Sequence, residues 1–247
     1  MDFKPKFTAQ VPRPAKGERV YAIGDVHGRH DLLVQLLNKV IGHYPTLKPT
    51  PSRITLLFLG DIIDRGPESR RCLALVKHLV EKAQAKLLMG NHEDMLLASL
   101  EGDGLAQEAW IRNGGLATLQ SYGIDPPQSS EDAFDFAARL QERIPEDHVR
   151  FLRTLGVSYS SGSYFFAHAG VRPGVRIARQ DERDLFSIRD DFTNSEKWHG
   201  QVVVHGHSIV ETVDVRHNRI AIDTAAYATG RLSCLCLQDA HVSVLTT

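Results

Sequence analysis

Five short apolar runs along the chain are each followed at once by a cluster of polar residues. The runs are partly β-branched, as buried strands are, and they cover residues 20–23, 54–59, 86–89, 164–167 and 201–204. In open α/β sheets the strand ends carry the ligand-binding loops, because a rigid sheet holds these loops while they stay accessible. The pattern therefore predicts one functional rim, built from loops that lie far apart in the sequence.

Between the first three runs, apolar residues recur at helical spacing over residues 32–41 and 72–80. This alternation of strand and helix predicts a parallel sheet with right-handed crossovers and covering helices. A segment rich in Ala, Leu and Glu and broken by glycine and proline then predicts a helical insertion or cap at about 95–155.

The last third of the chain, residues 157–244, alternates and is rich in β-branched residues, which predicts a second, mostly β layer. We therefore expect an α/β fold in which a two-layer β-sandwich is flanked by helices. With 247 residues and 42% hydrophobic content the chain can bury a full core, and we expect a single domain over residues 1–247.

Charge and cysteine content limit the partners. The 29 basic and 30 acidic residues nearly cancel, so there is no electrostatic reason to expect nucleic acid or an anionic membrane. The start of the chain lacks the continuous apolar segment of a secretory signal, and we expect a cytoplasmic protein. Cys72 falls in a helical pattern, and Cys234 and Cys236 alternate on one side of a strand; all three are expected to be buried free thiols.

The polar clusters contain six side chains that can bind metal ions. Asp25 and His27 are two residues apart at a strand end, so an extended backbone directs both to the same side. The other four strands end at Asp61, Asn91, His168 and His207. Mixed carboxylate and imidazole donors fit manganese, iron or zinc better than calcium, although ligand type alone does not select among the three. Of these we expect manganese, with iron or zinc as alternatives. Two ions about 3.5–4 Å apart could activate a nucleophile and clamp a phosphoryl group.

Simpler explanations exist for each cluster taken alone. Gly24 to Gly28 fits a tight turn between strand and helix, and Asp61 or Asp64 fits a helix N-cap. Asn91 fits a left-handed turn residue, and His168 fits a buried core histidine. Five such clusters after five strands, all rich in metal-binding side chains, are poorly explained by turns. The joint pattern favours a two-metal site.

In this order, the clusters GDVHG, GDIIDRG, GNHE, HAG and HGH resemble the phosphoprotein-phosphatase branch of the calcineurin-like metallophosphoesterases. The resemblance extends over most of the chain. It implies that Asp25 and His27 bind one metal ion, that Asp61 bridges, and that a second ion is bound by the remaining three predicted ligands, which are Asn91, His168 and His207.

The resemblance also implies roles in catalysis. His92 would be the general acid, oriented by Asp64, and Arg65 would grip the phosphate together with Asn91 and His92. Arg189 is similar to a second phosphate-binding arginine of bacterial members, although a surface salt bridge is an alternative for it. A metal-bridging hydroxide would attack phosphorus directly, without a phosphoenzyme.

Several residues near these clusters have open assignments. Trp110 is expected to pack, Asn113 is a candidate for the substrate rim, and Tyr227 is expected in the core or at a sheet edge. Family members often carry an arginine where this chain has Met89, so one phosphate contact is missing or comes from elsewhere. His205 is not expected to be a ligand.

The leading functional hypothesis is a dinuclear-metal phosphomonoesterase similar to bacterial serine/threonine protein phosphatases, acting on a phosphorylated protein. The alternative is a symmetrical diadenosine tetraphosphate hydrolase, acting on a dinucleoside polyphosphate. A third hypothesis is a catalytically silent phosphoprotein-binding scaffold, which the intact ligand set and His92 disfavour. Between the two enzyme hypotheses, the choice of substrate would be decided by the helical insertion and by Arg112 and nearby groups.

Overall fold

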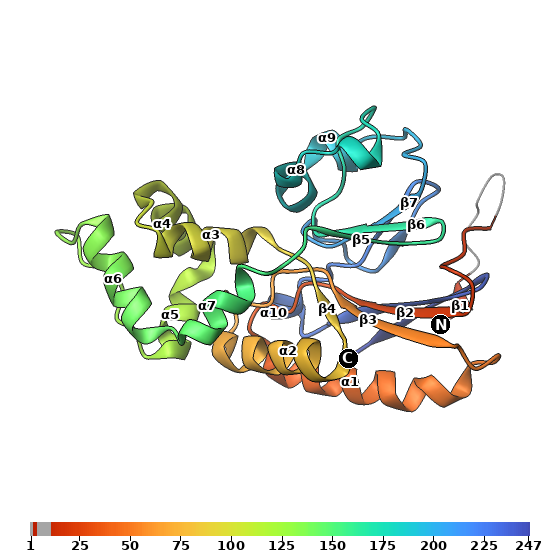
Figure 1. The fold of residues 1–247 in the computed structure, drawn as a ribbon, viewed down its shortest axis with the longest axis horizontal. Helices are drawn as coiled ribbons and strands as arrows, with labels where there is room; N and C mark the ends of the chain where they lie inside the picture. Colours follow the sequence, from red (N-terminus) through yellow and green to blue (C-terminus); the bar gives the residue numbers. More distant parts are fainter. Residues whose placement is uncertain (1, 4–10) are drawn as a thin grey trace.

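The computed structural model describes residues 2–3 and 11–247. The expectation that no secretory signal is present rests in part on residues 1 and 4–10, which lie outside the described residues. Four layers are stacked in the order helix, sheet, sheet, helix (Figure 1). A group of further helices lies beside the sandwich, at the left of Figure 1. The expected fold class, two sheets flanked by helices, is confirmed.

The first sheet has six strands in the order β1-β11-β10-β2-β3-β4. β2, β3 and β4 are parallel, whereas β10 pairs antiparallel with β2, and β11 with β10. All six residues of β2 are buried, as its unbroken apolar character requires of a strand covered on both faces. The strands span β1 Asp2–Phe3, β2 Glu18–Ile23, β3 Arg53–Phe58, β4 Lys86–Leu87, β10 Ser233–Gln238 and β11 His241–Thr246.

The second sheet has five strands in the order β5-β6-β7-β9-β8. Its central strands β6, β7 and β9 are parallel, and the edge strands β5 and β8 are antiparallel to their neighbours. The strands span β5 Ser158–Ser161, β6 Tyr164–Ala167, β7 Val202–His205, β8 Asp214–Val215 and β9 Arg219–Ala221.

Helices cover the outer faces of both sheets (Figure 1). α1 and α2 cover the first sheet, and α8 and α9 lie over the second; they span α1 His30–His43, α2 Ser69–Ala83, α8 Glu182–Ser187 and α9 Asp190–Thr193. Short helical turns occur at η1 Tyr44–Thr46, η3 Ile177–Arg179 and α10 Ala226–Thr229.

The segment after β4 is helical as far as Leu152 and forms the group beside the sandwich (Figure 1). It includes a π-helical turn, η2, with Gly114 at φ 112°. The helices span α3 Asn91–Leu100, α4 Gly104–Trp110, η2 Ile111–Gly115, α5 Leu116–Tyr122, α6 Ala133–Arg143 and α7 Glu146–Leu152.

The core is divided into three apolar clusters, one at each junction between layers. Alternate residues of β2 separate them: Tyr21 and Ile23 pack toward the helices, and Val20 and Ala22 pack toward the second sheet. The third cluster lies between the second sheet and α8 and α9, around Phe192. The period-two alternation of a strand therefore fixes the sheets against each other and against their helices.

One sequence expectation about the layers is wrong. The predicted second layer, residues 157–244, was expected to stay together, but β10 and β11 return to the first sheet and pair with β2. Alternation indicates a strand without indicating its partner, because every strand offers the same ladder of backbone groups. Cys234 and Cys236 consequently face α1 and α2 in the same apolar cluster as Cys72, a residue of α2, and all three cysteines are buried and free.

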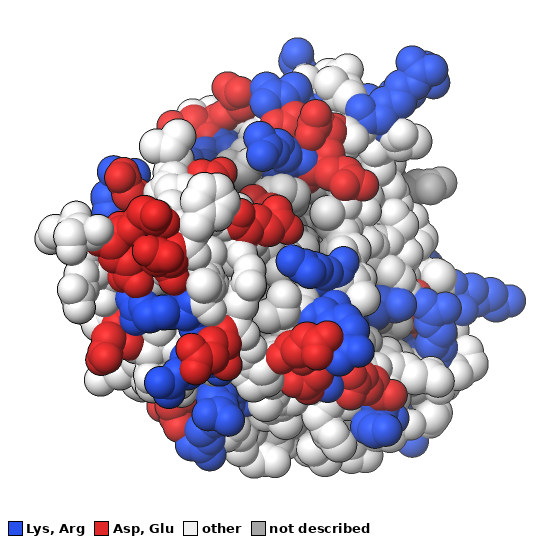
Figure 2. All heavy atoms as spheres, turned by 60° about the vertical axis from the view of Figure 1, so that its left-hand side comes forward, with Lys and Arg blue, Asp and Glu red and all other residues white. Residues whose placement is uncertain are grey.

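In the described part of the chain, every helix is too short or too polar to cross a membrane. Figure 2 shows acidic and basic side chains interspersed on the face that brings the helical segment forward. This distribution matches the formal net charge of −1.

Candidate metal and phosphate site

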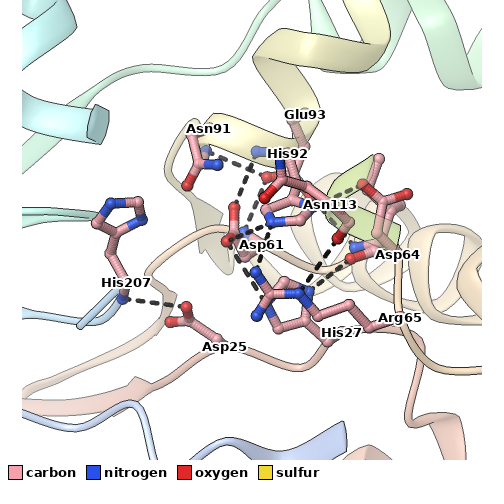
Figure 3. Close-up of polar contacts among 12 residues, drawn as sticks. Asp25, His27, Asp61, Asp64, Arg65, Asn91, His92, Glu93, Asn113 and His207 are labelled. Carbon is pink, nitrogen blue, oxygen red and sulfur yellow. Dashed lines mark hydrogen bonds and ion pairs between the residues drawn. The ribbon is translucent and has the colours of Figure 1, made fainter. Parts of the chain in front are cut away.

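The polar clusters converge at one rim of the sandwich, where β2, β3, β4, β6 and β7 end. Figure 3 shows side chains from these separate loops gathered around Asp61. Two groups of possible ligand atoms meet there, each within 4.8 Å: His27, Asp61 and His92, and Asp61, His168 and His207. Asp61 belongs to both groups.

The Asp61 carboxylate has its two oxygens turned toward different partners. Oδ1 lies 3.4 Å from His168 Nε2. Oδ2 lies 3.6 Å from His27 Nε2 and 3.7 Å from His92 Nε2. A carboxylate placed in this way can share its oxygens between two cations, one on each side.

On the Oδ1 side, three donor atoms from three loops face a common point. His168 Nε2 lies 3.1 Å from Asn91 Oδ1 and 3.2 Å from His207 Nδ1. His168 Nδ1 donates to the Leu59 carbonyl at 3.0 Å, so the neutral ring presents the lone pair of Nε2 to that point. This set is the predicted ligand group of the second ion.

On the Oδ2 side, His27 is oriented in the same manner. Its Nδ1 donates to the Ile63 carbonyl at 2.9 Å, which leaves Nε2 as the ligand atom. Asp25, the other predicted ligand, accepts a hydrogen bond on Oδ2 from the His207 backbone N–H at 3.0 Å. Gly206 is required there, because a Cβ atom would overlap the Asp25 carboxylate.

Two of the candidate ligand atoms are buried and have no hydrogen-bond partner among the described residues: Asp25 Oδ1 and His27 Nε2. Buried polar atoms are almost always paired, and a buried carboxylate without a counter-charge is costly. Asp25 has no ion pair within the described part of the chain. The orphaned atoms and their oxygen and nitrogen chemistry therefore fit bound metal ions.

The electrostatics of these residues fit a site for cations. Burial, and then the nearby Asp223 carboxylate, raise the pKa of Asp25 well above its usual value. Burial lowers the pKa of His27 and of His207 to about 3, so both rings are neutral at pH 7 and could act as metal ligands. Burial also disfavours the charged form of His168, but the Asp61 carboxylate outweighs it and raises the pKa to about 9. A cation must displace that proton, so metal affinity should depend on pH.

The backbone of the site is strained. Eight non-glycine residues in the described part of the chain have positive φ, and five of them belong to these loops, with φ from 44° to 72°: His27, Asp61, Asp64, Arg65 and His207. Such residues cost of order 1–3 kcal/mol each and gather at functional sites, where the surroundings hold them.

Glu93 holds the Asp61 loop in place, a role that the sequence did not reveal. Its buried carboxylate accepts four backbone hydrogen bonds: Asp61 N–H at 2.8 Å, Ile62 N–H at 2.8 Å, Ile63 N–H at 3.3 Å and Gly90 N–H at 3.1 Å. An acidic residue in the first turn of α3 was the available signal, because such residues bind exposed N–H groups at helix starts.

His92 and Asp64 are paired as predicted. His92 Nδ1 lies 2.6 Å from Asp64 Oδ2, and both residues are buried. Burial opposes the charged imidazole, but Asp61 and Asp64 outweigh it and raise the pKa of His92. Arg65 Nη2 donates to His92 Nε2 at 3.1 Å, so in this structure Nε2 carries the lone pair and the ring proton is on Nδ1.

Tyr227 lies at the site, and the expectation of a core or sheet-edge tyrosine is wrong. The Arg65 guanidinium lies over its ring at 4.8 Å, and the His27 ring meets it edge-on at 5.4 Å. Asp223, four residues earlier, was also missed as a neighbour of Asp25. The signal for Asp223 was its place directly after the apolar residues of β9, as in the five clusters.

A cavity of about 520 Å³ adjoins the metal set. Asp61, Arg65, His207 and Tyr227 line its inner end, and Arg189 lines it from the start of α9. The described residues form no hydrogen bond or ion pair with the Arg189 guanidinium, so the alternative of a salt bridge is not realised there. The structure thus brings both predicted phosphate-binding arginines to one cavity.

The remaining candidates lie as follows. Trp110 is buried as expected and also contacts Asp64. The Asn113 side chain bonds back to Ala109 O at 2.7 Å, and its own carbonyl accepts from Arg65 Nε at 3.3 Å. His205 is buried outside both ligand groups.

Met89 and Arg112 are outside the two groups of candidate ligands. Met89 is tied to Gly156 through its backbone N–H. Arg112 lines a separate cavity between α4 and α6.

Comparisons with known proteins agree with this geometry. The chain is 29% identical over 230 residues to a protein of Bacillus thuringiensis named bis(5′-nucleosyl)-tetraphosphatase PrpE, asymmetrical, and covers 88% of it with 86% of its own length. A Geobacillus protein of the same name is 27% identical over 231 residues, with 87% and 89% of the two chains covered. A crystal structure of a putative diadenosine tetraphosphatase superimposes with a TM-score of 0.61 at 21% identity, over 94% of this chain and 95% of that one. Residues 18–234 match the model of the calcineurin-like phosphoesterases. The family predicted from the motifs is confirmed, and the chain belongs to the calcineurin-like phosphoesterases.

Proposed function

We propose that this chain is a phosphoric ester hydrolase that uses two metal ions, held by Asp25, His27, Asp61, Asn91, His168 and His207. The observation that carries the proposal is the Asp61 carboxylate, whose two oxygens face different histidine groups. Bound ions would supply Lewis-acid activation of water and of the phosphoryl oxygens. We expect manganese, with iron or zinc as alternatives, because the oxygen and imidazole donors fit all three metals.

Arg65 and Arg189 bind the phosphoryl oxygens. A guanidinium stays charged and donates two parallel hydrogen bonds, which suits a tetrahedral oxyanion. Arg65 is held in position by the Tyr227 ring and by the Asn113 carbonyl. Arg189 reaches the same cavity from α9 and has no competing partner among the described residues, so it supplies the second cation that Met89 cannot.

His92 acts as the general acid. Asp64 binds Nδ1, fixes the ring and favours its protonated form, so Nε2 can deliver a proton to the departing oxygen. His92→Asn should slow hydrolysis of a phosphoserine peptide by about 10²–10⁴-fold, and that of 4-nitrophenyl phosphate much less, because nitrophenolate leaves without protonation. Equal losses on both substrates would contradict the acid role.

The leading substrate class is a phosphorylated protein. The second candidate is a dinucleoside polyphosphate, which is favoured by the names of the relatives. Those names specify asymmetrical cleavage, whereas the motifs led us to expect symmetrical cleavage. Asymmetrical hydrolysis of diadenosine tetraphosphate yields AMP and ATP, and symmetrical hydrolysis yields two ADP, so product analysis separates the two.

The deciding experiment compares turnover of a phosphoserine peptide and of diadenosine tetraphosphate by the manganese-loaded protein. A ratio of kcat/KM of at least about 10² in either direction would assign the substrate class. Asp61→Asn should reduce both activities by more than about 100-fold. Losing a residue that only supports a metal ligand costs about 10–100-fold, and Asp61 is proposed to bind both ions itself. Asp135→Asn, an exposed change on α6, is the matched control and should have no effect. Absence of any chelator-sensitive hydrolysis would favour the scaffold hypothesis instead.

A further inference from the structure

The helical segment beside the sandwich contacts the carboxylate that orients His92. Trp110, at the end of α4, donates its indole N–H to Asp64 at 3.0 Å from Oδ1 and 2.9 Å from Oδ2. Thr118, in α5, donates its hydroxyl to Asp64 Oδ1 at 2.5 Å. Both side chains are fully buried. The Asp64 carboxylate therefore holds His92 on one side and two donors from the helical segment on the other.

Thr118 also binds the backbone of Asp64. The Asp64 N–H donates to Thr118 Oγ1 at 3.0 Å and to Ser69 Oγ at 2.9 Å. Asp64 has a φ of 72°, in the left-handed region that a residue with a Cβ rarely adopts. Such a conformation persists only where neighbours over-determine it. Thr118 restrains both the strained backbone and the carboxylate.

The turn that connects Trp110 to Thr118 is shaped for this contact. In η2 the Gly114 carbonyl accepts the Arg65 N–H at 3.1 Å, and a Cβ at Gly114 would lie 2.7 Å from Arg65 Cγ. A Cβ at Gly115 would lie 2.7 Å from the Trp110 indole. Gly114, with a φ of 112°, is not helical and makes a kink between α4 and α5. One irregular turn thus fits against Asp64 and Arg65 at once.

We propose that Trp110 and Thr118 are positioning residues, which fix the Asp64 carboxylate and through it the His92 imidazole. The inference rests on the proposed role of His92. The torsion that turns a carboxylate is broad, so a single partner would leave Asp64 free to rotate. Three donors shared between its two oxygens select one orientation, which aims His92 Nε2 at the leaving oxygen. The helical segment is then a working part of the acid apparatus.

The test compares Thr118→Val, which removes the hydroxyl at nearly constant volume, with Thr118→Ser, which keeps it. With the manganese-loaded full chain, Thr118→Val should reduce kcat on a phosphoserine peptide about tenfold or more, with KM and the rate on 2,4-dinitrophenyl phosphate nearly unchanged. Thr118→Ser should restore most of the rate. Thr154→Val, which removes an exposed hydroxyl just after the helical segment, is the control.

A double-mutant cycle identifies the path of the effect. In a His92→Asn background, Thr118→Val should cause no further loss, because the imidazole that it positions is already gone. Trp110→Phe should behave like Thr118→Val, because it removes the indole N–H and keeps an aromatic ring. Equal loss on both substrates, or a further loss in the His92→Asn background, would reduce Thr118 to a structural role and overturn the proposal.

A readout independent of activity separates this inference from the proposed function. In the metal-free protein, the His92 Nδ1–H proton held by Asp64 should give a protected proton NMR resonance in wild type and in Thr118→Ser. It should broaden or disappear in Thr118→Val. An unchanged resonance would overturn the inference even if the enzyme is active. A resonance that behaves as expected in a protein with no hydrolytic activity would uphold the positioning contact and refute the proposed function.

Discussion

Replacing Glu93 by Gln tests how the Asp61 loop is held. The Glu93 carboxylate uses Oε2 for the N–H groups of Asp61 and Gly90, and Oε1 for those of Ile62 and Ile63. An amide keeps only one acceptor oxygen. Whichever way it is placed, its NH₂ group faces two backbone N–H groups that can no longer be satisfied.

The expected loss of stability follows from those two donors. A buried donor left without a partner costs about 1–3 kcal/mol, so the change should lower the free energy of unfolding by about 2–6 kcal/mol. Natural domains have only about 5–15 kcal/mol in total. Burial raises the pKa of Glu93 to about 7, so the comparison belongs at pH 8, where the carboxylate is ionised.

Urea denaturation in the presence of a chelator measures this loss directly, without a contribution from bound metal. Glu108→Gln, an exposed change on α4, is the matched control and should stay within about 0.5 kcal/mol of wild type. Manganese titration of the same proteins should show weaker binding in Glu93→Gln, because the Asp61 backbone loses two of its anchors. A destabilisation below about 0.5 kcal/mol would refute the idea that this carboxylate holds the loop.

Three further predictions concern the metal set. Gly206→Ala should lower the number of manganese ions bound, measured by elemental analysis, because its Cβ displaces Asp25; Gly42→Ala, in open space on α1, should bind the full number. Because the folded-state pKa of His168 is raised to about 9, its contribution to stability is complete below pH 6.5 and is lost as the pH rises through 9. The melting temperature of the protein in the presence of a chelator should therefore fall from pH 7 to pH 9.5. An equal fall in the melting temperature of the metal-loaded protein would refute this. Asp61→Asn should remove the metal-induced rise in melting temperature, which calorimetry measures.

The sequence could predict which side chains meet at the rim, because each candidate ligand follows a strand whose apolar run is easy to identify. Parallel strands share one edge, so polar residues after them must meet. The same logic failed for the order of strands. β10 could pair with either sheet as far as its residues show, and its antiparallel place beside β2 is fixed by packing of Leu235 and Leu237 between the sheets.

Contacts made by the helical segment were hidden for a different reason. Trp110 and Thr118 lie 46 and 54 residues from Asp64, and no local pattern links them to it. The π-helical turn that joins them depends on two glycines whose neighbours come from other segments. Tyr227 was missed similarly, because its partners Arg65 and His27 belong to loops near the other end of the chain.

The two halves of the site depend on different parts of the fold. The candidate metal ligands come from both sheets. Asp61 follows a strand of the first sheet and His168 follows a strand of the second, and His168 Nδ1 donates to the Leu59 carbonyl of the first. A bound cation would therefore hold the sheets together at this rim, and looser packing between them would weaken metal binding. Asp64 and His92, in contrast, are contacted from the helical segment through Trp110 and Thr118. If His92 acts as proposed, changes in that segment should alter the rate on poor leaving groups while the metal ligands stay in place.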